Sequence, residues 1–173
     1  MLLRITLIFF LISFSLNAHD SKKKKSLKAH EHGVGILNIS QDNSVLLFEF
    51  EAPGYDIVGF EYKANKDEDI KKVENALNVL SDYKNIILPS ASGDCIKDKS
   101  ESKIVYEGNH SEFIAEYKLV CKNIANLKRI YIKYFNNFAY SKKLNIKILG
   151  KNKKTAYVAN KNKKIIKLKN FFN

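Results

Sequence analysis

Residues 112–121, Glu-Phe-Ile-Ala-Glu-Tyr-Lys-Leu-Val-Cys, alternate between apolar and polar side chains and decide the fold class. A period of two is typical of a β-strand with one buried face and one outward face. The side chains expected on the buried face are Phe113, Ala115, Tyr117, Leu119 and Cys121. Those expected on the outward face are Glu112, Glu116 and Lys118, with Ile114 and Val120 as apolar exceptions.

A hairpin is predicted upstream of this strand. Residues 44–52 place Leu46, Phe48 and Phe50 on one face, and residues 33–40 form a preceding strand. Gln41-Asp42-Asn43 supplies the turn between them. Pro53-Gly54 then breaks the pattern, and we expect residues 55–61 to be extended or looped.

One helix is expected over residues 67–83. Its apolar residues Ile70, Val73, Leu77 and Leu80 fall on one stripe. Asn65 could cap this helix, with Glu68 three residues further on. The helix would cover one side of the sheet.

The remaining pattern is β-rich. Further strands are expected at 86–88, 103–107, 129–134, 143–149, 154–159 and 164–169. Residues 90–102 are expected to form a loop, Gly108-Asn109 a turn, and 135–140 an aromatic turn. The predicted fold is therefore mainly β (α+β), an antiparallel β-sandwich or curved sheet with one packed helix.

The N-terminus has the pattern of a secretory signal peptide. Arg4 precedes an apolar run from Ile5 to Leu16, and we expect cleavage after Ala18. Leu16 is not ideal three residues before the cut, so an uncleaved anchor stays open. The predicted organisation is a signal peptide (1–18), a lysine-rich leader (19–29) and a single domain (30–173). The mature chain is expected in the periplasm, without stable membrane insertion.

Cys95 and Cys121 are the two cysteines of the chain. An even pair in an exported protein indicates a disulfide, which would stabilise the fold by about 3–4 kcal/mol. Thiolate metal ligands are the other interpretation, and the lack of a Cys-x-x-Cys spacing disfavours it.

The formal net charge is +12, and the segment 122–173 has fifteen basic residues and no acidic ones. This segment could bind an anionic surface, or its lysines could be solvated strand faces. We favour the second interpretation. Nucleic acid is not expected as a partner, because arginine, which suits bidentate phosphate binding, occurs only at Arg4 and Arg129.

Histidine chemistry is confined to four residues: His19, His30, His32 and His110. On an extended chain, His30 and His32 point to the same face and can converge on one ion such as zinc, which binds imidazole. His110 follows a turn and could be a third ligand, and Glu61 could add an oxygen. The alternatives are that His110 is a surface histidine without a ligand role and that Glu61 is a solvated carboxylate. His19, once N-terminal, could chelate copper.

Catalytic motifs are missing: there is no Gly-x-Ser-x-Gly, no phosphate-binding glycine loop and no His-Glu-x-x-His. We therefore do not expect an enzyme.

Several short motifs occur in an order that resembles one family. They are His30-Glu31-His32-Gly33-Val34, Leu37-Asn38-Ile39, Glu49-Phe50-Glu51-Ala52-Pro53, Val58-Gly59-Phe60-Glu61, Cys95, His110-Ser111-Glu112-Phe113-Ile114-Ala115-Glu116-Tyr117 and Cys121. This series resembles the ZrgA-type family of exported bacterial proteins implicated in periplasmic zinc uptake. The resemblance implies that His30, His32 and His110 are family histidines and that the two cysteines are paired.

The chain departs from that family in two ways. Tyr62 stands where members often have a histidine after the Phe-Glu pair, and a long histidine-rich insertion is absent. We expect a periplasmic zinc-binding protein that assists high-affinity zinc uptake. Its partner would be the periplasmic component of a zinc importer, and copper and nickel remain possible ions. The alternative is an interaction protein without metal, using its basic C-terminal half on an anionic surface.

Overall fold

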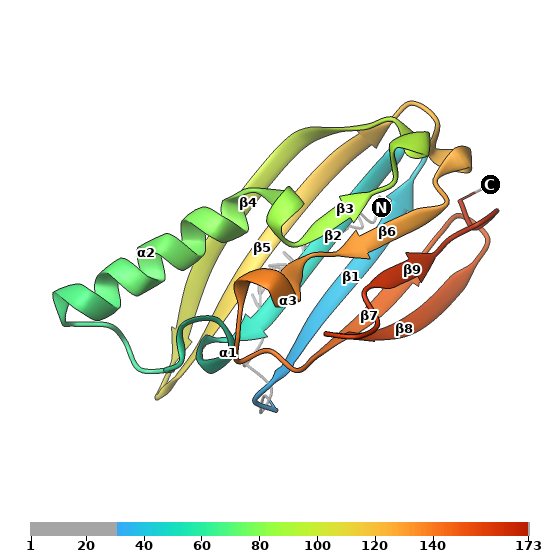
Figure 1. The fold of residues 1–173 in the computed structure, drawn as a ribbon. Coiled ribbons are helices and arrows are strands. Elements are labelled where there is room, and N and C mark those ends of the chain that lie inside the picture. The colour runs from blue at the N-terminus through green and yellow to red at the C-terminus, as the bar shows by residue number, and fades with distance from the viewer. Residues whose placement is uncertain (1–30, 173) are drawn as a thin grey trace, which may run out of the picture.

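A computed structural model describes residues 31–172 of the chain. About half of these residues lie in strands, arranged as one sheet of six strands and one of three (Figure 1). The strands are β1 (Val34–Asp42), β2 (Val45–Pro53), β3 (Ile87–Pro89), β4 (Cys95–Glu107), β5 (His110–Cys121), β6 (Arg129–Ile132), β7 (Lys143–Leu149), β8 (Lys154–Asn160) and β9 (Ile165–Lys167). The helices are α1 (Gly54–Val58), α2 (Asp67–Ser81) and α3 (Tyr134–Asn137), with single 3-10 turns at Tyr83–Asn85, Ala91–Gly93 and Ile124–Asn126.

The six-stranded sheet has the order β4-β5-β2-β1-β7-β8, and the smaller sheet has the order β3-β6-β9. The predicted hairpin is confirmed: β1 and β2 pair antiparallel, with Ile36 opposite Glu51. The β1–β7 pair is parallel and every other pair is antiparallel. The predicted β-rich fold with one packed helix is therefore confirmed, in the form of a mixed sheet.

The core lies between the large sheet and the layer formed by α2 and the small sheet (Figure 1). All five residues expected on the buried face of 112–121 are buried. The helix α2 contributes Val73, Ala76 and Leu80 to this core, and the buried Tyr117 hydroxyl donates to the Leu80 carbonyl at 2.7 Å. The alternating stretch therefore sets which face of the sheet carries the core.

Four expectations about local structure were wrong. Residues 54–58 form a helix because Pro53, at φ −56°, precedes it and Gly59, at φ 86°, ends it. Residues 90–102 were expected to form a loop, but β4 begins within them at Cys95. β4 is an edge strand that pairs only with β5 and is largely exposed, so its sequence does not alternate in polarity. The cap of α2 is Lys66, without a side-chain hydrogen bond, and not Asn65.

The fourth error concerns Glu112, which was expected to face outward. Its exposed fraction is 3%. Glu112 lies on β5 opposite Val105 of β4 and Pro53 of β2, at the end of β5 against which α1 packs.

The predicted disulfide is present. Cys95 and Cys121 are bonded and lie directly opposite each other on β4 and β5. Cys121 is completely buried at the end of the core face, as expected.

Candidate metal centre

Three of the four predicted ligands have described positions, and the structure brings all three together. His32 lies in the turn before β1, Glu61 in the connection between α1 and α2, and His110 at the start of β5. Glu61 is 29 residues from His32 and 49 residues from His110 in the sequence. The grouping is therefore produced by the fold, because β1, β2 and β5 are arranged so that these segments meet at one end of the sheet.

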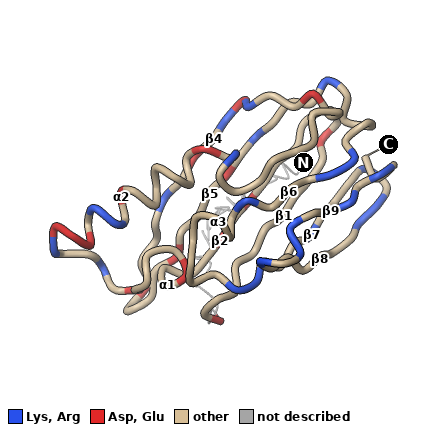
Figure 2. The backbone as a smooth tube through the Cα atoms, viewed as in Figure 1, with Lys and Arg blue, Asp and Glu red and all other residues tan. Residues whose placement is uncertain are grey.

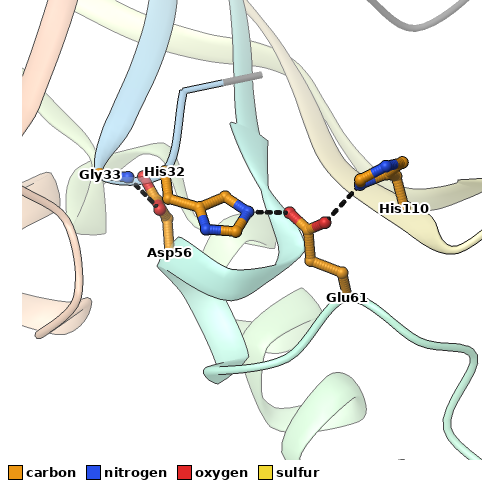
Figure 3. Close-up of polar contacts among 5 residues, drawn as sticks. All are labelled: His32, Gly33, Asp56, Glu61 and His110. Carbon is orange, nitrogen blue, oxygen red and sulfur yellow. Dashed lines mark hydrogen bonds and ion pairs between the residues drawn. The ribbon is translucent and has the colours of Figure 1, made fainter. Parts of the chain in front are cut away.

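Glu61 bridges the two imidazoles (Figure 3). Its Oε1 lies 3.1 Å from His32 Nε2, and its Oε2 lies 2.6 Å from His110 Nδ1. The side chains are 54% exposed for His32, 12% for Glu61 and 68% for His110. The carboxylate is thus held in place, while both imidazoles remain accessible to an ion from solvent.

A buried carboxylate supports the His32 turn from the opposite side. The backbone N–H of Gly33 donates to Asp56 Oδ1 at 2.6 Å, and Gly33 has φ 90°, a conformation that glycine adopts readily. Asp56 is fully buried, and its Oδ2 has no hydrogen-bond partner among residues 31–172. Burial raises the pKa of Asp56 above its ordinary value, although the Gly33 hydrogen bond and the charge of His32 oppose this effect.

The sequence analysis missed Asp56. A sign of it is present in the sequence, since Asp56 is the one charged residue between Gly54 and Phe60. A carboxylate in such an apolar stretch is usually buried with a partner.

Tyrosine rings pack beside His32. The Tyr55 ring lies 5.0 Å from the His32 ring at an interplanar angle of 13°, which is a stacked arrangement. Tyr140 lies 5.3 Å beyond Tyr55. These contacts restrict the His32 ring on one side and leave its Nε2 directed at Glu61.

Tyr62 is directed at α2 and not at the two histidines. Its ring stacks on Phe60, and its hydroxyl donates to Asp69 Oδ2 at 2.8 Å. This hydrogen bond raises the pKa of Tyr62 and lowers the pKa of Asp69. Tyr62 therefore has a structural partner of its own.

The three side chains have the donor types that zinc prefers, imidazole nitrogen and carboxylate oxygen. Two zinc ligands at about 2.0–2.1 Å and a tetrahedral angle lie about 3.3 Å apart. The His32–Glu61 distance of 3.1 Å is close to this, and the His110–Glu61 distance of 2.6 Å would have to open. Within residues 31–172, no group of three or more His, Cys, Asp or Glu is already arranged to hold an ion.

Three predicted residues lie outside the described part of the chain: His30, His19 and the cleavage residue Ala18. Cys95 and Cys121, the remaining metal-ligand candidates, are joined to each other.

The fold and this cluster define a disulfide-bonded β-domain with accessible histidine and carboxylate side chains at one end. A family model described as ZrgA family zinc uptake protein matches residues 29–168, so the chain belongs to this family. The resemblance found in the sequence is confirmed. No curated protein matches the chain.

Family membership associates the chain with zinc and suggests a role without catalysis. The disulfide and a zinc uptake family together fit an extracytoplasmic protein. Within the described residues, no helix has the length and apolar character that crossing a membrane requires.

Proposed function

We propose that the protein binds zinc in the periplasm and assists high-affinity zinc uptake. The observation that carries this proposal is the Glu61 carboxylate held between His32 and His110. Three segments that are distant in sequence converge to place two imidazoles on one carboxylate. Family membership in zinc uptake supplies the identity of the ion.

In the proposed complex, zinc replaces the protons shared between Glu61 and the imidazoles. His32 Nε2, His110 Nδ1 and a Glu61 oxygen would each bind the ion. Both histidine side chains are more than half exposed, so they have room to rotate toward a shared ion. A fourth ligand completes the usual tetrahedral set, and we assign it to His30.

Glu61 has a second consequence for the ion. A carboxylate among the ligands lowers the net charge of the zinc complex by one, and zinc sites commonly include one. The exposed position of the histidines favours exchange of the ion with a partner. We therefore assign the protein the role of passing zinc to the periplasmic component of an importer.

Zinc titration calorimetry on residues 19–173 tests this proposal. The wild type should bind one zinc ion per chain, and His110→Ala and Glu61→Gln should each weaken binding at least tenfold. The matched control is His19→Ala, which removes an imidazole outside the cluster. Loss of binding in the control with retention in His110→Ala would refute the assignment and favour a metal site at the N-terminus.

A further inference from the structure

The acidic residues of the chain are segregated from its C-terminal part. All 18 Asp and Glu residues precede residue 122, whereas fifteen Lys and Arg residues follow from there on. A compositional bias toward lysine would enrich lysine everywhere, but it would not remove carboxylates from one segment. Figure 2 shows acidic positions along α1, α2 and β4 and none along β6, β7, β8 or β9.

Few basic side chains of this segment are neutralised by acidic groups within residues 31–172. Within residues 31–172, Lys122 is the one basic residue from position 122 onward that forms an ion pair, at 3.9 Å from Asp94. Other lysines contact uncharged oxygens, as Lys164 Nζ does with Asn136 Oδ1 at 2.8 Å. Their charge is therefore available to an external partner.

The small sheet arranges part of this charge around an apolar row. Ile87, Ile130, Ile132 and Ile166 point into the core. Leu88, Tyr131 and Ile165 are directly paired across β3, β6 and β9, and they therefore share the outer face. Ile165 is 49% exposed.

Basic residues lie on both sides of this row. Arg129 of β6 is directly opposite Lys167 of β9 on one side. On the other side, Lys133 lies two residues beyond Tyr131, so it continues the same face of the strand. We call these residues, Leu88, Arg129, Tyr131, Lys133, Ile165 and Lys167, the basic face.

We propose that the basic face docks onto an anionic phospholipid surface. An apolar centre between lysines suits a bilayer interface, where apolar side chains enter the headgroup region and cations meet anionic lipid. Lysine, a point charge, suits a diffuse anionic surface, whereas recognition of individual phosphates favours arginine. Asp94 is an acidic residue beside the face: it lines a hollow with Leu88 and Tyr131 and itself faces Lys122.

Vesicle binding tests this proposal without zinc. Residues 19–173, which contain every described element, are titrated with vesicles of phosphatidylcholine containing 30% phosphatidylglycerol. The test variant is Arg129→Gln/Lys133→Gln/Lys167→Gln. The matched control is Lys63→Gln/Lys66→Gln/Lys71→Gln, which removes the same charge from exposed lysines before and within α2.

The wild type should bind these vesicles, and binding should disappear at high salt. Each lysine near an anionic bilayer contributes about fivefold to binding, so the test variant should bind roughly 100-fold more weakly than the wild type. The control should lose less than tenfold, and Ile165→Ser should also weaken binding. Equal losses in test variant and control would show that only net charge matters and would overturn the proposal. Binding to polyphosphate but not to vesicles would overturn it in favour of a polyanion partner.

Discussion

The Gly33 N–H and the Asp56 carboxylate form a hydrogen bond of 2.6 Å that ties the turn carrying His32 to α1. The bond is buried, and it joins two segments that are 23 residues apart. It fixes the backbone next to a proposed zinc ligand, while Glu61 contacts that ligand from the other side (Figure 3). The position of His32 therefore depends on a residue that would not itself bind the ion.

Replacing Asp56 by alanine should weaken both the fold and the zinc site. Asp56→Ala leaves the Gly33 N–H without its acceptor, which costs about 1–3 kcal/mol of unfolding free energy. Residues that orient metal ligands typically change affinity by about 10- to 100-fold, and we expect a loss in that range. Asp56→Asn keeps an acceptor oxygen and should retain most of the affinity. Urea unfolding and calorimetry measure the two effects, and unchanged affinity in Asp56→Ala would contradict the supporting role.

Asp56 should also make the stability of the metal-free protein depend on pH. Burial raises its pKa, so the folded state binds this proton more tightly than the unfolded chain does. The contribution of Asp56 is therefore most favourable below its unfolded pKa and is lost as pH rises through the raised pKa. Between pH 4 and pH 7, wild type should lose stability relative to Asp56→Asn. An identical pH profile for both proteins would contradict the predicted effect.

Zinc binding should itself depend on pH. Imidazole must be neutral to bind a metal, and histidine ordinarily becomes protonated below about pH 6. Calorimetry at pH 7.5 and pH 5 should show affinity falling by more than tenfold at the lower pH. Equal affinities would show that histidine does not supply the ligands.

The disulfide and the zinc site should behave independently. Cys121 and His110 are the two ends of β5, about 35 Å apart at about 3.3 Å per residue. Cys95→Ser/Cys121→Ser should lower the unfolding free energy by about 3–4 kcal/mol. The variant that remains folded should bind zinc with wild-type affinity, as measured by chemical denaturation and calorimetry on the same sample. A large loss of affinity in the folded variant would contradict this independence.

Gly54 should be required for α1, β5 and the connection that carries Glu61 to approach one another at the site. A Cβ at this position would lie 2.0 Å from Ser111 Oγ and 2.8 Å from the Phe60 carbonyl oxygen. Gly54→Ala should therefore displace β5 or the Glu61 connection, lowering both stability and zinc affinity.

Gly108→Ala provides the comparison for Gly54→Ala. Gly108 has a positive φ of 59° but open space around it, so only backbone strain of about 1 kcal/mol is expected. Its zinc affinity should stay unchanged. Equal affinities for both alanine variants would show that the close approach at Gly54 does not position the site.

The fold was predictable where one face of an element is buried. The alternation in 112–121 predicted its core face correctly, because exposure there differs sharply between the two faces. The edge strand β4 was only partly predicted, since its face toward α2 carries the serines Ser100 and Ser102 and its sequence therefore has no apolar period. The parallel β1–β7 pair joins segments about a hundred residues apart, and no local pattern encodes such a pairing.

The candidate site was predictable by residue type and not by arrangement. The scarcity of histidine directed attention to His32 and His110, and Glu61 was considered because it follows Gly59-Phe60 in a segment expected to be looped. That Glu61 lies between the two imidazoles depends on tertiary contacts. Asp56 and the stacked Tyr55 were missed for the same reason, because their importance arises only when α1 packs against the His32 turn.

Zinc-edge X-ray absorption on the one-to-one complex of residues 19–173 tests the central claim most directly. The account predicts about four nitrogen and oxygen ligands near 2.0 Å, with the scattering signature of at least two imidazoles and no sulfur. The imidazole signal should decrease in His32→Ala/His110→Ala. A spectrum without imidazole, or one unchanged in that double variant, would contradict a zinc site built on His32, Glu61 and His110.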